Sequence, residues 1–592
     1  MATFDNIKKI AGDFRGLGKL WPWLRVSKGR VFFALGLIPL IAALQTSVPL
    51  IIKDTIDRGV QHGRFDIITT GAIIFFVVVV CEYAGRSGQA LLMALSVHRM
   101  IRDLRLSLVR HIMKLSARFH DHSLSGALVT RATSDFDNLS ESLNQGVLTA
   151  LVDMSMLVGA VIGLLILDWQ LALCIFMVLP VVAVVVTTFS RLLKRAMLNA
   201  RSRIAALNAY NQECLYGAST IKLLAAEEAA EGRITRLAKE YRNAQMTSVI
   251  LDALMFSTLD GMAVITMGVF LWVALAGLAG EATLTPGLLV AFIAYINAMF
   301  EPLKQLGNKM AMMQGAFTSI DRIFGIMETR DFVAGQDRLP SIAGHIEFDH
   351  VSFSYGGRPQ DQVLHDISFE LNQGESMAIV GSTGSGKSTI IKLISKLYDG
   401  YEGCIRLDGT DLREFEGSHL RRMMSIVPQD IVLFDGTVAF NISLGQEEIS
   451  RSDVEEACRL VGADHFIRQL PGGYDATITE GGQNLSQGQR QLIAFARALA
   501  RDPGLIILDE ATASVDPESE TFIQRAISRV MESRTVIVIA HRLSTIRSCD
   551  QIMVIERGKV QESGNHTELL QRQGAYHRLY HALLTREATG TS

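Results

Sequence analysis

The sequence has few of the features that indicate a zinc site, a disulfide framework or a nucleic-acid-binding surface. Its 592 residues include only six cysteines, which are scattered and form no Cys-X-X-Cys pair. Lysine and arginine (57) do not outnumber aspartate and glutamate (60), and the net charge is −3, whereas binding a phosphate backbone normally requires a basic excess. We therefore expect reduced, structural thiols and no nucleic-acid partner.

The composition predicts two kinds of domain in one chain. Hydrophobic residues make up 49% of the sequence, more than is usual in soluble proteins, yet 20% of residues are charged, which does not fit a uniform membrane bundle. The length also suggests several units of domain size. A membrane domain joined to a soluble domain satisfies both observations.

The first half contains apolar runs of about 20 residues, the length that crosses a bilayer as a helix. They predict six transmembrane helices, at about residues 31–52, 67–97, 146–167, 170–190, 250–275 and 284–308, in a membrane domain that spans residues 31–328. Residues 1–30 show apolar positions at helical spacing. They form either an amphipathic elbow helix in the membrane interface or an ordinary packed cytosolic helix.

Positive charge is distributed unequally among the loops, and basic loops are retained on the cytoplasmic side. Residues 191–242 contain ten lysines and arginines, whereas the turn at Asp168–Trp169 and the loop Leu275–Pro286 contain none. Both termini are therefore expected to be cytoplasmic. The long polar connections between spans are rich in helix formers, which indicates helical extensions of the membrane helices.

The second half has the pattern of an α/β domain at residues 345–582, after a linker at 329–344 and before a tail at 583–592. Helical stretches separate its apolar strand candidates, which predicts a mainly parallel sheet. The candidates are His345–Phe353, Met377–Val380, Leu505–Leu508 and Thr535–Ala540.

One predicted strand runs directly into a glycine-rich loop and then an apolar helix. The loop reads Gly381-Ser382-Thr383-Gly384-Ser385-Gly386-Lys387-Ser388-Thr389, which matches GxxxxGK[ST] in its strand–loop–helix setting. Glycine lets backbone N–H groups turn toward phosphate oxygens. Lys387 would balance the charge of the β- and γ-phosphates, and Ser388 would hold Mg²⁺. The sequence thus predicts binding of ATP and Mg²⁺.

Two other strands end in residues suited to ATP hydrolysis. Asp509 and Glu510 follow Leu505–Leu508, where the aspartate can orient Mg²⁺ and the glutamate can polarise the attacking water. His541 follows the strand Thr535–Ala540 and is placed to contact the γ-phosphate, although a lone histidine after a strand is more often structural.

With these motifs the chain resembles an ATP-binding cassette (ABC) exporter of the half-transporter type over nearly its full length. The resemblance is carried by the phosphate loop, Leu485-Ser486-Gln487-Gly488-Gln489, Leu508-Asp509-Glu510, Ala513-Ser514-Val515-Asp516 and Ala540-His541-Arg542. It implies an α-helical membrane domain of six helices followed by an α/β P-loop NTPase. It also implies that Tyr355 stacks on adenine and that Gln429 senses the γ-phosphate and assists Mg²⁺.

The resemblance also implies a dimer, because in this family the signature segment Leu485–Gln489 acts on the ATP held by the opposite subunit. A helix N-terminus of small residues offers N–H donors to phosphate, which agrees with that role. Gln487 stands where glycine is typical. This departure leaves open whether the partner is an identical copy or a related subunit.

The resemblance implies an ATP-driven exporter of amphipathic or hydrophobic cargo that is drug-, lipid- or peptide-like. The expected location is the bacterial inner membrane, with the ATPase in the cytoplasm. A same-fold importer of metal chelates and an ATP-gated channel or regulator remain alternatives.

Segments near residues 122–128 and 209–221 resemble coupling helices, or else are polar turns. Asp260, inside a predicted span, contacts cargo or a proton, or forms an interhelical hydrogen bond.

Overall fold

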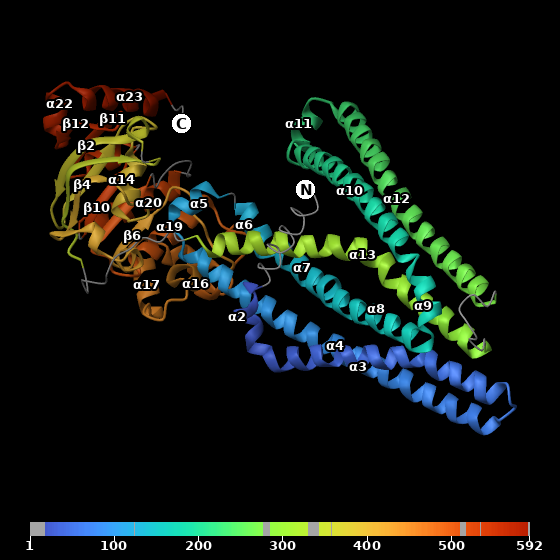
Figure 1. The fold of residues 1–592 in the computed structure, drawn as a ribbon. Helices are drawn as coiled ribbons and strands as arrows, with labels where there is room; N and C mark the ends of the chain where they lie inside the picture. The colour runs from blue at the N-terminus through green and yellow to red at the C-terminus, as the bar shows by residue number, and fades with distance from the viewer. Residues whose placement is uncertain are drawn as a thin grey trace. The chain divides into compact units, whose positions relative to one another are not determined.

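The computed structural model describes residues 18–589 except 124, 276–284, 330–341, 357, 510–516, 533 and 541. Two compact units make up the chain. The first combines Met1–Met113 with Ser125–Thr329, and the second combines Lys114–Leu124 with Arg330–Ser592. Figure 1 shows that the first unit is built from long helices and that the second contains β-sheets with helices around them.

The first unit contains eleven α-helices among its described residues. They are α2 (Trp21–Leu24), α3 (Lys28–Asp54), α4 (Phe65–Lys114), α6 (Ser125–Ala132), α7 (Ser134–Glu141), α8 (Leu148–Leu167), α9 (Trp169–Phe176), α10 (Leu179–Tyr216), α12 (Glu227–Leu275) and α13 (Pro286–Met327), with the short α11 (Ala218–Leu223) between α10 and α12. π-Helical turns η2 (Thr55–Val60) and η3 (Ser142–Val147) precede α4 and α8.

Six helical segments of the described chain are long and apolar enough to cross a membrane, which confirms the expected number. They are Trp21–Val60, Phe65–Lys114, Ser125–Leu167, Trp169–Tyr216, Glu227–Leu275 and Pro286–Gln305. α4 has 50 residues and α12 has 49. At about 1.5 Å per residue these helices exceed the roughly 30 Å hydrocarbon core more than twofold, so they continue well beyond the membrane.

Aromatic packing holds the membrane helices together. The rings of Phe270 and Phe292 are stacked with centroids 4.7 Å apart, joining α12 to α13. Tyr295 packs closely over Gly163 of α8, where an added Cβ would lie 2.4 Å from the tyrosine ring. Only glycine allows this approach, which fixes α8 against α13.

The second unit contains a six-stranded sheet in the order β12-β11-β3-β10-β9-β6 and a four-stranded antiparallel sheet in the order β2-β1-β4-β5. The strands of the larger sheet are β3 (Ser376–Val380), β6 (Met424–Val427), β9 (Leu505–Asp509), β10 (Thr535–Ile539), β11 (Gln551–Glu556) and β12 (Lys559–Gly564); only β12 is antiparallel to its neighbour. The smaller sheet comprises β1 (Ile346–Ser354), β2 (Gln362–Leu371), β4 (Glu402–Leu407) and β5 (Thr410–Asp411), and β7 (Gly436–Thr437) pairs with β8 (Thr477–Ile478).

Helices surround these sheets within the same unit. They are α5 (Ala117–His122), α14 (Lys387–Ile394), α15 (Gly417–Met423), α16 (Val438–Ser443), α17 (Arg451–Leu460), α18 (Asp464–Gln469), α19 (Gln487–Leu499), α20 (Pro517–Met531), α21 (Leu543–Arg547), α22 (His566–Gln571) and α23 (Ala575–Thr589). This is the expected α/β architecture.

Three features depart from the sequence-based expectations. The antiparallel sheet adds to the mainly parallel sheet that was expected. α23 continues to Thr589, so most of the expected tail at 583–592 is helix. Lys114–Leu124 belongs to the second unit, which interrupts the membrane domain expected at 31–328. The linker expected at 329–344 lies mostly outside the described residues.

Candidate nucleotide-binding site

Three parts of the expected ATP site, the phosphate loop, Asp509 and Gln429, lie at one edge of the six-stranded sheet. β3, β10, β9 and β6 run parallel, with Ile539 opposite both Ile379 and Asp509. Because the carboxyl ends of parallel strands meet at one edge, the phosphate loop after β3 and Asp509 at the end of β9 share that edge. Gln429 follows β6 at the same edge and is exposed.

Several expected site residues lie outside the described part of the chain. They are Glu510 and His541, with Ser514 and Asp516 of the segment between β9 and α20. Their assigned roles therefore remain predictions from the sequence.

Glycine conformations shape the phosphate loop. Gly384 and Gly386 have φ angles of +80° and +106°, which residues with a Cβ rarely adopt. Gly386 is also the N-cap of α14, so the loop leads directly into a helix N-terminus, whose N–H groups favour an anion.

Two polar side chains in this loop fit a nucleotide's phosphates. Lys387 is buried, and its Nζ donates hydrogen bonds to the carbonyl oxygens of Gly381 (2.9 Å) and Ser382 (3.0 Å). The buried Oγ of Ser385 has no hydrogen-bond partner among the described residues. An unsatisfied buried hydroxyl is costly unless a ligand engages it. Exposed Ser388, on the first turn of α14, is accessible to Mg²⁺.

Tyr355 lies beside the phosphate loop. Its hydroxyl is 3.1 Å from the Oγ1 of Thr389, in the first turn of α14. Its ring makes edge-to-face contacts with Phe353 and Tyr398, at centroid distances of 5.1 and 4.9 Å. The structure thus brings Tyr355 to the loop, and its stacking on adenine remains a prediction.

The signature segment forms the N-terminus of α19. The Oγ of Ser486 accepts a hydrogen bond from the backbone N–H of Gln489, while the Gln489 side chain accepts one from the N–H of Ser486. This reciprocal capping box fixes the first turn of the helix. Ser486 and Gln487 are exposed, Leu485 and Gly488 are buried, and Gln489 is half-buried.

Three ion pairs of the membrane unit involve the acidic residues Asp260, Asp153 and Glu82, which lie in the predicted spans. The Nζ of Lys304 on α13 lies 2.5 Å from Oδ1 of Asp260 on α12, and Lys309 on α13 pairs with Asp153 on α8. Arg86 pairs with Glu82 on α4 at 2.7 Å. Sequence analysis singled out Asp260 and missed the lysines of α13. Lys304 lies near the end of the predicted span 284–308, and Lys309 directly follows that span, which was the signal available in the sequence.

One of the two segments expected to be a coupling helix is displaced along the chain. The helix assigned to the ATPase unit is α5 (Ala117–His122), just before the expected residues 122–128. The Oδ2 of its Asp121 accepts hydrogen bonds from Tyr398 (2.5 Å) and Lys392 (3.4 Å). The second expected segment, 209–221, covers the end of α10 and the start of α11, and α11 has no buried residue.

Comparisons with known proteins agree with both units. Residues 31–303 match the transmembrane region of ABC transporters, and residues 364–513 match the ABC transporter ATPase family. A putative ABC transporter ATP-binding protein of Streptococcus pneumoniae is 32% identical over 95% of this chain and 96% of its own length. ATP-dependent lipid A-core flippases of Haemophilus influenzae and Chromohalobacter salexigens are 31% and 35% identical, covering 95% and 83% of this chain and 96% and 84% of their own lengths.

Proposed function

Because this chain belongs to the ABC transporter family and fuses the membrane region to the ATPase, as half-transporters of the exporter type do, we propose that it exports amphipathic, lipid-like molecules as a dimer. Membership of the family establishes that the chain couples ATPase activity to transport across a membrane. The proposal adds the direction, the chemical class of the cargo and the assembly.

The observation that carries the cargo class is the set of intramembrane ion pairs. Lysine and arginine inside a membrane are expensive and mark pathways for polar groups. Lys304 lies 2.5 Å from Asp260 and 3.4 Å from Glu301, and this cluster of charges offers hydrogen-bonding groups to a polar headgroup, while apolar helix faces accept acyl chains. The lipid A-core flippases, which are similar to this chain along most of its length, are named for moving a lipid, and this supports the same class.

The proposed hydrolytic step uses residues at the edge of the six-stranded sheet. Lys387 and the loop N–H groups bind the phosphates, and Glu510 polarises a water that attacks the γ-phosphorus as the bond to the β-phosphate oxygen breaks. Ser388 and Asp509, with Gln429, would hold Mg²⁺, which neutralises charge on the phosphates. His541 would donate a hydrogen bond to the γ-phosphate.

The proposed assembly pairs two chains head to tail. The exposed N-terminus of α19, led by Ser486, would close the ATP held by the other subunit. Ser514 and Asp516, in the segment 513–516 that this family calls the D-loop, would lie between the two sites. The termini and the ATPase would be cytoplasmic, because the basic loops of the sequence lie on that side.

Reconstitution tests this proposal directly. In sealed proteoliposomes with the ATPase outside, the wild-type protein should move a fluorescent lysophospholipid or lipid A analogue between leaflets only with ATP and Mg²⁺. Glu510→Gln should bind ATP yet abolish turnover and movement, while Lys387→Ala should lose ATP binding. Sustained ATP-dependent lipid movement by Glu510→Gln would contradict the role of Glu510 in hydrolysis. Ion conductance without stoichiometric ATP use would favour a channel.

A further inference from the structure

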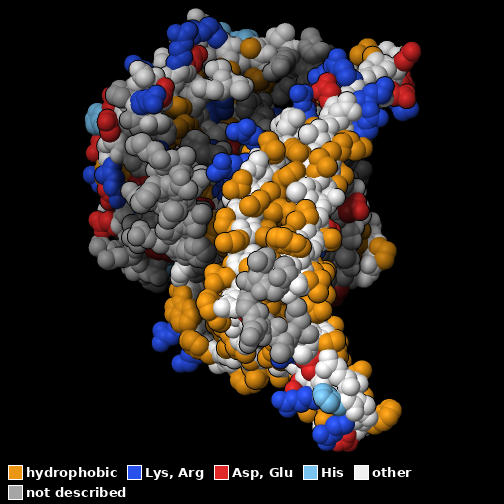
Figure 2. Space-filling view, turned by 45° about the vertical axis from the view of Figure 1, so that its right-hand side comes forward, with side chains coloured by type: hydrophobic (Ala, Val, Ile, Leu, Met, Phe, Trp, Pro, Cys, Tyr) orange, Lys and Arg blue, Asp and Glu red, His pale blue; other side chains and the backbone are white. Residues whose placement is uncertain are grey.

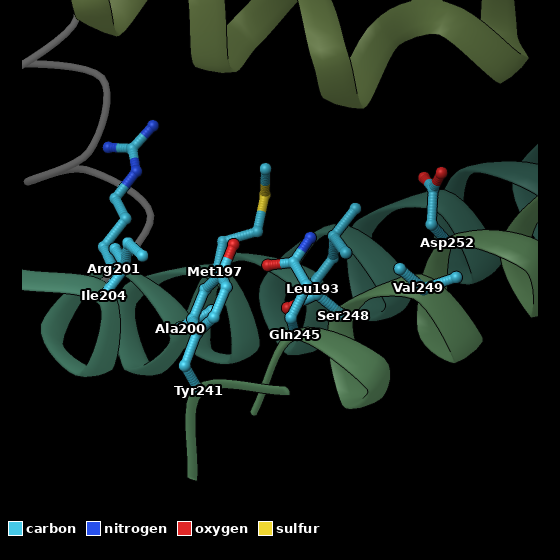
Figure 3. A pocket seen from close by; sticks show the side chains of 10 residues that line it. All are labelled: Leu193, Met197, Ala200, Arg201, Ile204, Tyr241, Gln245, Ser248, Val249 and Asp252. Atoms are coloured by element: carbon cyan, nitrogen blue, oxygen red, sulfur yellow. The ribbon is translucent and has the colours of Figure 1, made fainter. Parts of the chain in front are cut away.

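The surface features of the membrane unit belong to the function already proposed. A groove of about 260 Å³ lies between α10 and α12 (Figure 3), and α12 also carries Asp260 of the proposed cargo site. Exposed hydrophobic side chains gather along the long helices, and charged side chains gather toward the helix ends (Figure 2), as contact with lipid requires. A group of side chains on α23, in the second unit, has no part in ATP binding or in cargo movement.

Two histidines lie one turn apart on α23. Of the 14 histidines in the sequence, only His577 and His581 are four residues apart, the spacing that makes two side chains neighbours on a helix surface. Their Nε2 atoms are 3.1 Å apart. His581 is exposed and His577 is half-buried, so the pair lies at the surface of the ATPase unit.

The separation of the two nitrogens fits two ligands of one metal ion. Imidazole nitrogens bind Zn²⁺ at about 2.0–2.1 Å, so two of them on one ion lie roughly 2.9–3.4 Å apart in square or tetrahedral geometry. A straight N–H···N hydrogen bond would instead extend the two rings end to end. Here the ring centroids are only 4.4 Å apart while the Nε2 atoms are 3.1 Å apart, so the rings lie side by side and converge at these nitrogens.

Neighbouring aromatic rings restrict the movement of His581. Tyr580 contacts it edge to face, with ring centroids 5.9 Å apart, and also packs against His566 of α22 at 5.4 Å. The hydroxyl of buried Tyr576 lies 2.8 Å from Nδ1 of His566, which anchors this cluster to the unit. Less side-chain freedom is then lost when an ion binds, and this strengthens binding.

The chemistry of the pair selects the class of metal. Imidazole suits Cu²⁺, Ni²⁺ and Zn²⁺, whereas Mg²⁺, expected at the ATP site, prefers oxygen ligands. No third histidine, cysteine or acid among the described residues completes a metal centre. Water would fill the remaining positions, so the ion is exchangeable and is bound less tightly than in a closed structural site.

We propose that His577 and His581 bind a divalent transition-metal ion through their Nε2 atoms at the surface of α23. Each imidazole gives the ion a lone pair, so both rings are neutral in the bound state. The ion joins two consecutive turns of the helix. This site goes beyond the proposed export function, because binding here requires neither ATP nor cargo.

The experiment titrates the full-length protein in phosphatidylcholine nanodiscs with Cu²⁺–iminodiacetate and follows binding by electron paramagnetic resonance. The protein carries no polyhistidine tag, and its cysteines are blocked with N-ethylmaleimide. The chelator leaves the ion free positions for two imidazoles. The wild-type protein should bind the complex at least about tenfold more tightly than His577→Ala or His581→Ala, because the second imidazole binds intramolecularly. Equal affinities would indicate an adventitious ion only and would overturn the proposal.

A transposed pair provides the matched control. The double variant His581→Ala/Ala582→His keeps two histidines on α23 but puts five residues between them, which places the rings on different faces of the helix. Ala582 is exposed, so the added ring requires no repacking. This variant should bind the complex as weakly as His577→Ala and retain wild-type ATPase activity, which verifies its fold. Binding as tight as in the wild-type protein would show that the ion does not need the pair, and the assignment would be wrong.

Hydrogen exchange tests whether one ion joins both rings. The bound ion should slow exchange of the backbone amides of residues 577–585 at least about threefold, because opening of this turn must release the ion. The transposed variant should show no such change. Binding without protection in the wild-type protein would mean that the ion contacts a single imidazole, which also refutes the proposal. Failure of ATP-driven lipid movement with intact metal binding would affect only the proposed export function.

Discussion

Asp121 of α5 accepts a hydrogen bond from the hydroxyl of Tyr398, although 277 residues separate them in the sequence. Burial, and then the bond to Asp121, raise the pKa of the Tyr398 hydroxyl above its usual range. Lys392, on α14 after the phosphate loop, adds a second contact to the same carboxylate at 3.4 Å. One carboxylate thus ties the segment between α4 and α6 to the helix that begins at the ATP site.

Removing the Tyr398 hydroxyl should weaken this connection. Tyr398→Phe should lower the free energy of unfolding by about 1–2 kcal/mol, because it deletes a hydrogen bond to a charged group. It should also reduce the stimulation of ATPase activity by cargo at least about threefold. Calorimetry and ATPase assays in proteoliposomes measure both effects.

Tyr401 offers a matched control for that variant. It is as buried as Tyr398, at 6% exposure, but its hydroxyl has no hydrogen-bond partner among the described residues. Tyr401→Phe should therefore leave stability unchanged or slightly raised. Equal losses in the two variants would show that the Asp121 bond has no special role.

The serine that caps α19 should matter for activity beyond its effect on the helix. Ser486→Ala removes a capping box and should cost about 1 kcal/mol. Ser450→Ala removes an equivalent capping box from α17 and should cost as much. We expect only Ser486→Ala to reduce ATP hydrolysis, by at least about tenfold. Parallel thermal melts and ATPase assays compare them, and equal activity losses would contradict a role at the nucleotide.

The Ser385 hydroxyl should contribute to nucleotide binding and not to the free protein. Because its Oγ is buried without a partner in the described structure, Ser385→Ala should leave the nucleotide-free protein equally stable or more stable. The same change should weaken ATP binding by about three- to tenfold if the hydroxyl donates to a phosphate. Titration with a fluorescent ATP analogue measures the affinity. Unchanged affinity would place the hydroxyl outside the phosphate contacts.

The sequence predicts the phosphate loop well because adjacent residues carry the motif, and the edge position follows from the parallel strands β3 and β9. It places α5 only approximately, because the helix that joins the ATPase unit is identified by the contact of Asp121 with distant Tyr398. The partner of Asp260 was missed for the same reason. The pairing with Lys304 depends on how α12 packs against α13, which hydrophobicity along one helix does not specify.

A charge exchange separates structural and cargo roles of the Asp260–Lys304 pair. Asp260→Asn leaves Lys304 with Glu301, at 3.4 Å, as its remaining acid among the described residues, and should destabilise the membrane domain by at most about 1 kcal/mol, because the Asp260 side chain is 62% exposed. The double variant Asp260→Lys/Lys304→Asp restores opposite charges and should recover stability. If the pair serves only the fold, it should recover transport too. If Lys304 receives a polar headgroup, transport should stay low, because the ammonium then lies on α12 instead of α13.

Mixed dimers test the assignment of Lys387 and Ser486 to ATP sites on opposite subunits. Lys387→Ala and Ser486→Ala should each reduce ATPase activity when present in both subunits. When differently tagged chains carrying one variant each are co-expressed and purified through both tags, one site combines Lys387 from one chain with Ser486 from the other. That dimer should regain up to about half of wild-type activity, since one of its two sites is intact. A site built within a single chain would give no recovery, because each chain would then hold one defect. Purification of either chain with a related subunit in place of its copy would contradict the identical-partner form.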